Sequence, residues 1–402
     1  MRQNRGRRRI LGWLTACVLA VGGPAYGGVP EESQDQNESG PATASQPANG
    51  VDSFDDLLRK IRKKRRVPSL AALAIRGDDI IASGAVGVRK SRSKAKVTID
   101  DTYHLGSCTK SMTATLCAII VEEGKLRWDS TVGEVFPDLK EGFNEKLAGV
   151  TLEQLLCHRG GLPEDRQPDL TIFPRLLLLQ GEITSRREEM VKIVLAQTPA
   201  TEPGTDYAYS NLGFAIAGAM CEKVTGESYE TLMSEKLFKP LGMKSAGFGA
   251  PGIPKKIDQP RGHSKTLGIT SAIAPGDMGS DNPQVIAPCG TAHSSLPDWA
   301  KYAALHLNAA RGKPKLLQAK TFKKLHTDVF DQEYAFGWVI VDRPWAGGRV
   351  LVHDGSNGMW YAMLFIAPEK NLAFMVATNM GNEDAVDACH EAAAAMRDRY
   401  AQ

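Results

Sequence analysis

The sequence predicts an α/β (α+β) fold, in which strands from both ends of the chain form one antiparallel sheet flanked by helices, with a helical region inserted between them. Residues 69–88 and 334–378 contain apolar runs separated by turn segments, the pattern of hairpins and meanders. Residues 108–325 show mostly helix and loop patterns. We therefore expect a functional site between the sheet and the inserted helices.

Residues 1–27 have the composition of an export signal. A strongly basic start, MRQNRGRRR, is followed by an apolar run of about 14 residues and then by small residues suited to cleavage. The run is shorter than the roughly 20 residues that span a bilayer. We expect no stable membrane span, and an exported protein of the periplasm or cell envelope. A twin-arginine route and lipidation at Cys17 both stay open.

Residues 28–52 predict a disordered linker, because large apolar side chains are almost absent from them. A single domain is expected over 53–402. Its first helix has an apolar face, which consists of Phe54, Leu57, Leu58 and Ile61. The C-terminal helix is expected to begin after Asn382, a suitable N-cap.

The charge of the chain gives no case for nucleic-acid binding. Residues 1–27 hold five arginines and no acidic residue, so their removal changes the formal net charge from +3 to −2. The basic run RKIRKKRR at 59–66 fits a solvated helix face or a site for an anionic polymer or membrane surface. Cysteine spacing excludes a Cys108–Cys117 disulfide on one helix and leaves the other pairings open.

LGSCTKSM, residues 105–112, contains two candidate nucleophiles. On a helix Lys110 lies one turn above Ser107, whereas Cys108 points about 100° away, so the geometry favours Ser107. One S-x-x-K is weak evidence alone. Two further segments strengthen it: Tyr209-Ser210-Asn211 follows Ser107 by 102 residues, and His353-Asp354-Gly355 follows it by 246 residues on a predicted strand.

The order S-x-x-K, Y-x-N, H-x-G resembles the serine β-lactamase and penicillin-recognising enzyme superfamily. The likeness is greatest to class C β-lactamases, DD-peptidases with a His-Thr-Gly motif, and related D-aminopeptidases and esterases. Further segments at 151, 239, 289 and 334 look like the same family, so the resemblance covers roughly residues 54–400. Ser280-Asp281-Asn282 spells the class A middle motif, but it lies 173 residues after Ser107, too far for that class.

The resemblance implies a role for each motif residue. Tyr209 would be a proton shuttle, and Asn211 would orient Lys110 and the carbonyl side of the substrate. The backbone N–H groups of Ser107 and Ser356 would bind the oxyanion. Gly355 is expected to leave space for substrate along the strand edge.

Elementary chemistry agrees with these roles, because a serine hydroxyl needs a base to take its proton. A lysine with a pKa of about 10.4 is neutral in about one molecule in two thousand at pH 7, so Lys110 must be shifted by burial or act as a cation that favours ionised Tyr209. We expect the two to form one proton-transfer system.

His353 departs from the Lys-Thr-Gly motif that β-lactamases of this superfamily usually carry. An imidazole with a pKa of about 6.5 is only partly charged near neutral pH. Asp354 adds a negative charge unless strand alternation turns it away from the site. Both features would weaken a site for a substrate carboxylate. His104, His158 and His293 are expected to be non-catalytic.

We therefore expect a serine hydrolase that forms an acyl-enzyme on amide-like substrates, D-amino-acid peptides of cell walls or β-lactams. A carboxylesterase of the same fold and a non-catalytic cell-envelope binding protein that uses residues 59–66 are the alternatives. The expected partner is a small-molecule or peptide substrate, with no nucleic acid, cofactor or metal, and the chain is expected to be a monomer.

Overall fold

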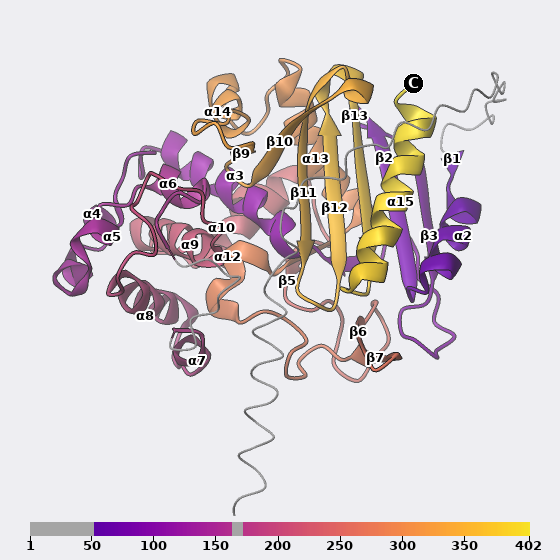
Figure 1. Ribbon diagram of the computed structural model, residues 1–402, viewed down its shortest axis with the longest axis horizontal. Helices are drawn as coiled ribbons and strands as arrows, with labels where there is room; N and C mark the ends of the chain where they lie inside the picture. Colours follow the sequence, from indigo (N-terminus) through magenta and orange to yellow (C-terminus); the bar gives the residue numbers. More distant parts are fainter. Residues whose placement is uncertain (1–51, 163–171) are drawn as a thin grey trace, which may run out of the picture.

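The computed structural model describes residues 52–162 and 172–402 (Figure 1). The predicted export signal at 1–27 and almost all of the predicted linker at 28–52 lie outside these residues. Within the two described ranges, every helix is too short or too polar to cross a bilayer.

One eight-stranded sheet unites the two ends of the chain, in the order β1-β3-β2-β13-β12-β11-β10-β9. Its strands are β1 (Asp52–Ser53), β2 (Ser69–Arg76), β3 (Asp79–Gly87), β9 (Tyr334–Ala335), β10 (Trp338–Arg343), β11 (Gly348–Ser356), β12 (Tyr361–Ala367) and β13 (Leu372–Thr378). All neighbours are antiparallel except the short β1 against β3. Strand β13 pairs with β2 from Leu372↔Arg76 to Ala377↔Ala71, which confirms the predicted fold class.

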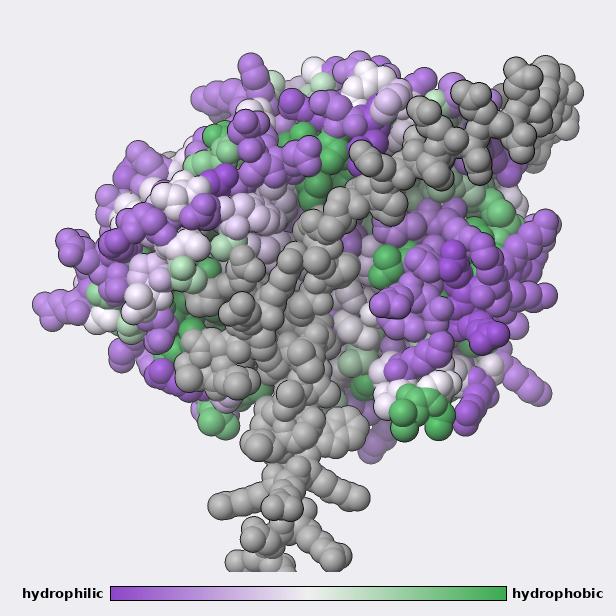
Figure 2. Space-filling model, viewed as in Figure 1, coloured by the Kyte–Doolittle hydropathy of each residue, from purple (hydrophilic) through white to green (hydrophobic). Residues whose placement is uncertain are grey.

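Helices α2 (Asp55–Arg65) and α15 (Glu383–Tyr400) cover one face of the sheet (Figure 1). Phe54, Leu58 and Ile61 pack with the alanines of α15, and the side chain of Asn382 accepts the Ala385 N–H as its N-cap. Basic residues of 59–66 also contact α15, because Lys64 and Arg65 form ion pairs with its acidic residues. The surface here is hydrophilic (Figure 2).

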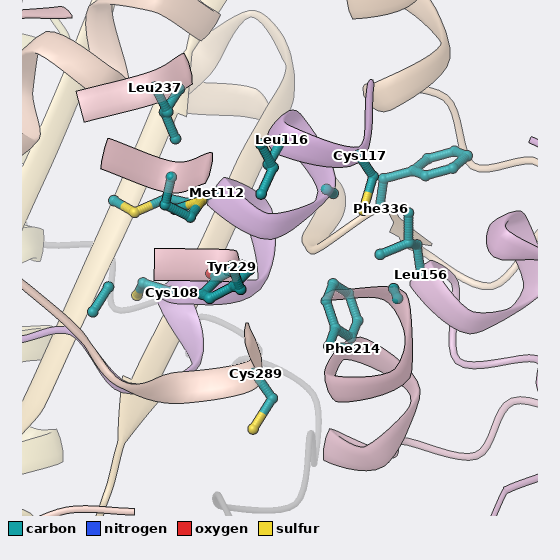
Figure 3. Close-up of a cluster of buried hydrophobic side chains, with 14 of the residues drawn as sticks. Cys108, Met112, Leu116, Cys117, Leu156, Phe214, Tyr229, Leu237, Cys289 and Phe336 are labelled. Carbon is teal, nitrogen blue, oxygen red and sulfur yellow. The ribbon is translucent and has the colours of Figure 1, made fainter. Parts of the chain in front are cut away.

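Helices α3 (Thr109–Glu122) and α13 (Leu296–Ala310) lie on the opposite face, beside the inserted helices. Residues 109–120 of α3 are all buried, since the helix is surrounded by sheet and helices (Figure 3). Side chains from distant segments pack around it, including Phe214, Tyr229, Leu237 and Phe336.

The inserted region completes the helical layer. Its helices are α4 (Val132–Val135), α5 (Glu145–Ala148), α6 (Leu152–Leu156), α7 (Ile172–Leu177), α8 (Ile183–Leu195), α9 (Asn211–Thr225), α10 (Tyr229–Met233), α11 (Lys239–Leu241), α12 (Ala287–Gly290) and α14 (Ala319–Leu325). The Sγ atoms of Cys117 on α3 and Cys221 on α9 lie 3.5 Å apart. The spacing of the cysteines in the sequence does not show that these two are neighbours.

Short strands also occur outside the two segments, 69–88 and 334–378, for which the sequence predicts strands. A three-stranded sheet contains β4 (Thr102–His104), β8 (Ala292–Ser295) and β5 (Gly247–Phe248), and β6 (Gly262–Thr266) pairs with β7 (Ile269–Ile273). These strands have two to five residues and polar sequences such as AHSS, so they lack the alternation that identifies a strand. The hairpin β6–β7 exposes Leu267 and Ile269, and Figure 2 shows a small hydrophobic patch there.

Candidate active site

Ser107 and Cys108 lie at the start of α3, in the short helix η1 (Gly106–Cys108), but in different environments. Ser107 is partly exposed, whereas Cys108 is buried. The Cys108 thiol donates to the His353 carbonyl oxygen at 3.4 Å, and burial raises its pKa well above the ordinary value. Cys108 is thus a buried thiol, and Ser107 is the side chain that a substrate can reach.

Lys110 and Tyr209 both reach the Ser107 hydroxyl. Lys110 Nζ is 3.0 Å from Ser107 Oγ, 2.5 Å from Asn211 Oδ1 and 2.9 Å from the carbonyl oxygen of Cys289. Tyr209 donates its hydroxyl to Ser107 Oγ at 3.0 Å, and Lys110 Nζ lies 4.8 Å from the centre of the Tyr209 ring. These four motif residues therefore form one connected cluster.

The cluster depends on α9, which packs against α3. Asn211 is the first residue of α9 and Tyr209 lies two residues earlier, so the start of α9 brings both to Lys110. The lysine side chain is fully buried, and three oxygens surround its ammonium group. The carbonyl of Cys289 comes from α12, a contact for which the sequence has no signal.

The His158 ring packs against the Tyr209 ring. Its Nδ1 accepts the Ser210 N–H at 3.1 Å, so its proton is on Nε2, which donates to the Tyr334 hydroxyl at 3.1 Å. The ring centres of His158 and Tyr209 are 4.3 Å apart. Burial lowers the pKa of His158 well below its usual value, with help from the Lys110 charge. His158 thus packs directly against a site residue.

Strand β11 touches the nucleophile segment backbone to backbone. A Cβ on Gly355 would lie 2.2 Å from the Leu105 oxygen and 2.4 Å from the Ser107 nitrogen. A Cβ on Gly106 would lie 2.3 Å from the Ser356 nitrogen. The amide nitrogens of Ser107 and Ser356 thus belong to adjoining segments. The absence of a side chain at Gly355 allows this close approach of the two backbones. Space for substrate along the strand edge at Gly355 stays a prediction.

His353 differs from the sequence expectation in its charge. The side chain is buried, and burial, together with the nearby Lys110 charge, lowers its pKa to about 4 although Asp354 opposes the shift. The imidazole is therefore neutral at pH 7. Asp354 points to the other face of the sheet, where its Oδ2 accepts the Tyr361 hydroxyl at 2.8 Å. Neither residue places a charge beside Ser107 at neutral pH.

Within residues 52–162 and 172–402, no group of three or more His, Cys, Asp or Glu side chains is arranged to hold a metal ion. The chemistry available at Ser107 is that of a hydroxyl, an amine, a phenol and backbone amides. This set suits acyl transfer to serine.

Known proteins resemble this chain over most of its length. "Penicillin-binding protein 4" of Amycolatopsis lactamdurans is 27% identical over 350 residues, which cover 83% of this chain and 85% of that protein. "Protein flp" of Staphylococcus aureus is 22% identical, over 82% of this chain but only 63% of that protein.

Solved structures share the fold. An octameric penicillin-binding protein homologue from Pyrococcus abyssi superposes with a TM-score of 0.68, at 23% identity, over 86% of this chain and 78% of that one. A D-stereospecific amidohydrolase from Streptomyces sp. gives 0.63, at 21% identity, over 83% and 98%. The Beta-lactamase family model matches residues 54–396. The chain therefore belongs to the beta-lactamase family, which contains serine acyl-transferases and hydrolases as well as non-catalytic members.

Proposed function

We propose that this protein is an exported serine hydrolase that forms an acyl-enzyme through Ser107. The observation that carries the proposal is the position of Ser107 Oγ, 3.0 Å from both Lys110 Nζ and the Tyr209 hydroxyl. A hydroxyl held by two groups that can exchange protons is what nucleophilic catalysis by serine requires. Export rests on the basic and apolar pattern of residues 1–27.

In the proposed reaction, Ser107 Oγ attacks the carbonyl carbon of the substrate, and its proton passes to the Lys110–Tyr209 pair. The negative oxygen that forms is bound by the N–H groups of Ser107 and Ser356. Collapse of this intermediate returns the proton to the leaving group and leaves an acyl-serine. Water, activated by the same pair, then attacks the ester and regenerates the serine.

Amide-like substrates, meaning D-amino-acid peptides or β-lactams, are the leading class. Support comes from the names of the relatives, which include a penicillin-binding protein and a D-stereospecific amidohydrolase. Carboxylesterase activity is the second candidate, and a specific observation favours it. Neutral His353 provides no cation for a substrate carboxylate, so an uncharged ester loses nothing at this position.

A non-catalytic binding protein is the third possibility. Its supposed binding surface is the basic run at 59–66, but two of those cations, Lys64 and Arg65, already form ion pairs with α15. A pure binder also has no need for a serine contacted by both Lys110 and Tyr209.

The test is intact-mass analysis of the purified protein after treatment with a fluorescent penicillin and with a fluorophosphonate. Labelling by both supports an enzyme that acts on β-lactams and related amides. Labelling by the fluorophosphonate alone supports an esterase. Labelling by neither contradicts the proposed function, and label that persists in Ser107→Ala contradicts the assigned nucleophile.

A further inference from the structure

The segment Ser280-Asp281-Asn282 lies beside the chain segment that carries the nucleophile, although its position in the sequence excludes it as the middle motif. It precedes the short helix η4 (Gln284–Ile286). Asp281 Oδ1 is 2.7 Å from His104 Nε2, the histidine side chain is fully buried, and the aspartate side chain is 16% exposed. His104 is the last residue of β4, three residues before Ser107.

The same histidine reaches the backbone of the nucleophile segment. His104 Nδ1 accepts the Gly106 N–H at 3.1 Å. Because Nδ1 is an acceptor, the ring proton is on Nε2 and is donated to Asp281. Gly106 has a left-handed φ of +51° and packs against the Ser356 amide. A chain of carboxylate, imidazole and amide thus fixes the turn that presents Ser107.

Asp281 also reaches the second segment of the expected oxyanion site. The side-chain amide of Asn357, the residue after Ser356, lies 3.5 Å from the same Oδ1 atom. The Asn357 Oδ1 atom in turn accepts the Met359 N–H at 3.1 Å. One carboxylate oxygen therefore contacts both segments that carry the two amides.

Asn282 extends these contacts to the lysine. Its side-chain amide donates to the Gly290 oxygen at 2.8 Å. The preceding residue, Cys289, has the carbonyl that accepts from Lys110 Nζ at 2.9 Å. The adjacent residues Asp281 and Asn282 thus contact three segments of the candidate site: the turn before Ser107 through His104, the segment after Ser356, and α12.

We propose that Asp281 is a positioning residue that sets the geometry of the oxyanion site through His104 and Asn357. This inference rests on the proposed function. Amide donors stabilise an oxyanion only when they are held in place before reaction, and loss of one donor or a displacement of about 1 Å lowers rates by roughly 100-fold. Asp281 contacts neither Ser107 nor the substrate carbonyl in this scheme. It acts through the two amides, which bind the oxyanion during reaction, so its loss should lower kcat.

The experiment compares Asp281→Ala and Asp281→Asn with the wild type, using p-nitrophenyl acetate and its thiono analogue. Sulfur accepts hydrogen bonds weakly, so the rate ratio of ester to thionoester reports on the oxyanion donors. Asp281→Ala is expected to lower kcat about 10- to 100-fold with little change in KM, and to reduce that ratio. Asp281→Asn keeps an oxygen for His104 and Asn357 and should recover most of the rate.

Two matched variants complete the design. Asp277→Ala removes a carboxylate of the same loop that accepts the Ala274 N–H, and it should leave kcat and the ratio unchanged. His104→Asn keeps an acceptor near the Nδ1 position but loses the link to Asp281, so it should resemble Asp281→Ala. Circular dichroism and thermal melting establish that each variant is folded.

The outcomes separate the inference from the function on which it rests. If the wild type hydrolyses the ester and Asp281→Ala keeps both kcat and the ester-to-thionoester ratio, Asp281 has no positioning role. The proposed hydrolase function is then unaffected. An equal loss for both substrates, with no recovery in Asp281→Asn, also overturns the inference, because it describes general destabilisation. A wild type that neither the fluorescent penicillin nor the fluorophosphonate labels overturns both.

Discussion

At the scale of single residues, burial separates the serine from the adjacent cysteine. Ser107→Ala is expected to abolish acylation, with turnover reduced on the order of 10³- to 10⁶-fold. Cys108→Ala should keep most activity, because the thiol packs behind the site and donates to the His353 carbonyl oxygen. Mass analysis after fluorophosphonate treatment checks both, and label on Ser107→Ala but not on Cys108→Ala would reverse the assignment.

Lys110 and Tyr209 contact the same oxygen, so their substitutions should not add. Tyr209→Phe keeps the ring, Lys110→Met keeps most of the volume, and each is expected to lose most turnover while remaining folded. The double variant should be little worse than either single variant, because each change disables the same proton transfer. Steady-state kinetics on all three provides the measurement. Losses that multiply would contradict a shared system.

The charge state of His353 gives a test of substrate class. With a pKa of about 4 the imidazole stays neutral from pH 5.5 to 8.5, so the ratio of penicillin to ester kcat/KM should be flat over this range. His353→Lys is expected to raise that ratio about 5- to 150-fold, because a cation would then attract the penicillin carboxylate.

Asp354→Asn is the matched control for this swap, since its carboxylate faces Tyr361 on the other side of the sheet. The control should leave the ratio unchanged. A wild-type ratio that falls as pH rises through about 6.5 would show instead that His353 is charged at the site.

At the scale of elements, the contact of β11 with η1 explains why two glycines face each other. Gly355→Ala would force its Cβ to within 2.4 Å of the Ser107 nitrogen, so a backbone must move. We expect a loss of about 1 to 3 kcal/mol in the free energy of unfolding and a larger loss of acylation. Urea denaturation and probe labelling measure the two effects.

Gly142→Ala is the control for this change, because a Cβ there meets no atom within 4 Å. Its stability should stay within about 0.5 kcal/mol of the wild type. If Gly355→Ala behaves like Gly142→Ala, the close approach of β11 to η1 is not a constraint on the site.

Elements with strong local patterns could be predicted from the sequence. The face of α2, the β2–β3 hairpin, the C-terminal meander and the Asn382 cap all follow from spacing or turn residues. The small sheet β4-β8-β5 could not, because its strands are stabilised by pairing with distant residues such as His104↔His293.

The candidate site also contains residues that the sequence predicts and residues that it does not. Ser107 and Lys110 share a helix face by spacing, and order along the chain indicates Tyr209 and Asn211. The Cys289 carbonyl and the Asp281 carboxylate reach the site through tertiary contacts alone. A backbone carbonyl is present at every residue, so sequence cannot say which one binds the lysine.

At the scale of the whole molecule, buried neutral histidines make stability depend on pH. His306 on α13 and His326 after α14 share a 2.9 Å contact, and His306 also meets the Thr115 hydroxyl of α3. Burial lowers the pKa of His326 to about 3, with a contribution from Arg349, and lowers that of His306 well below its usual value. Both are therefore neutral in the folded protein.

Below a pH of about 6.5 the unfolded chain binds protons that the folded chain does not, so the free energy of unfolding should fall as the solution becomes more acidic. Each such histidine is expected to cost about 2 kcal/mol by pH 5. Urea denaturation at pH 7.5 and 5.0 measures the fall. In His326→Gln, the fall in the free energy of unfolding between pH 7.5 and 5.0 should be smaller by about 2 kcal/mol, the contribution of one histidine. An unchanged fall would mean that His326 does not titrate on unfolding.

The place of β13 in the sheet has a consequence for biosynthesis. This strand lies between β2 and β12, so the main sheet stays divided until residues 372–378 have left the ribosome. Ser107, Lys110 and Tyr209 are all translated long before that point, yet the β11 segment that packs against Ser107 is held in place through β12 and β13. The β11 side of the site, which includes the Ser356 amide, is therefore completed only near the end of translation, which would delay any acyl-transfer activity until synthesis is almost complete.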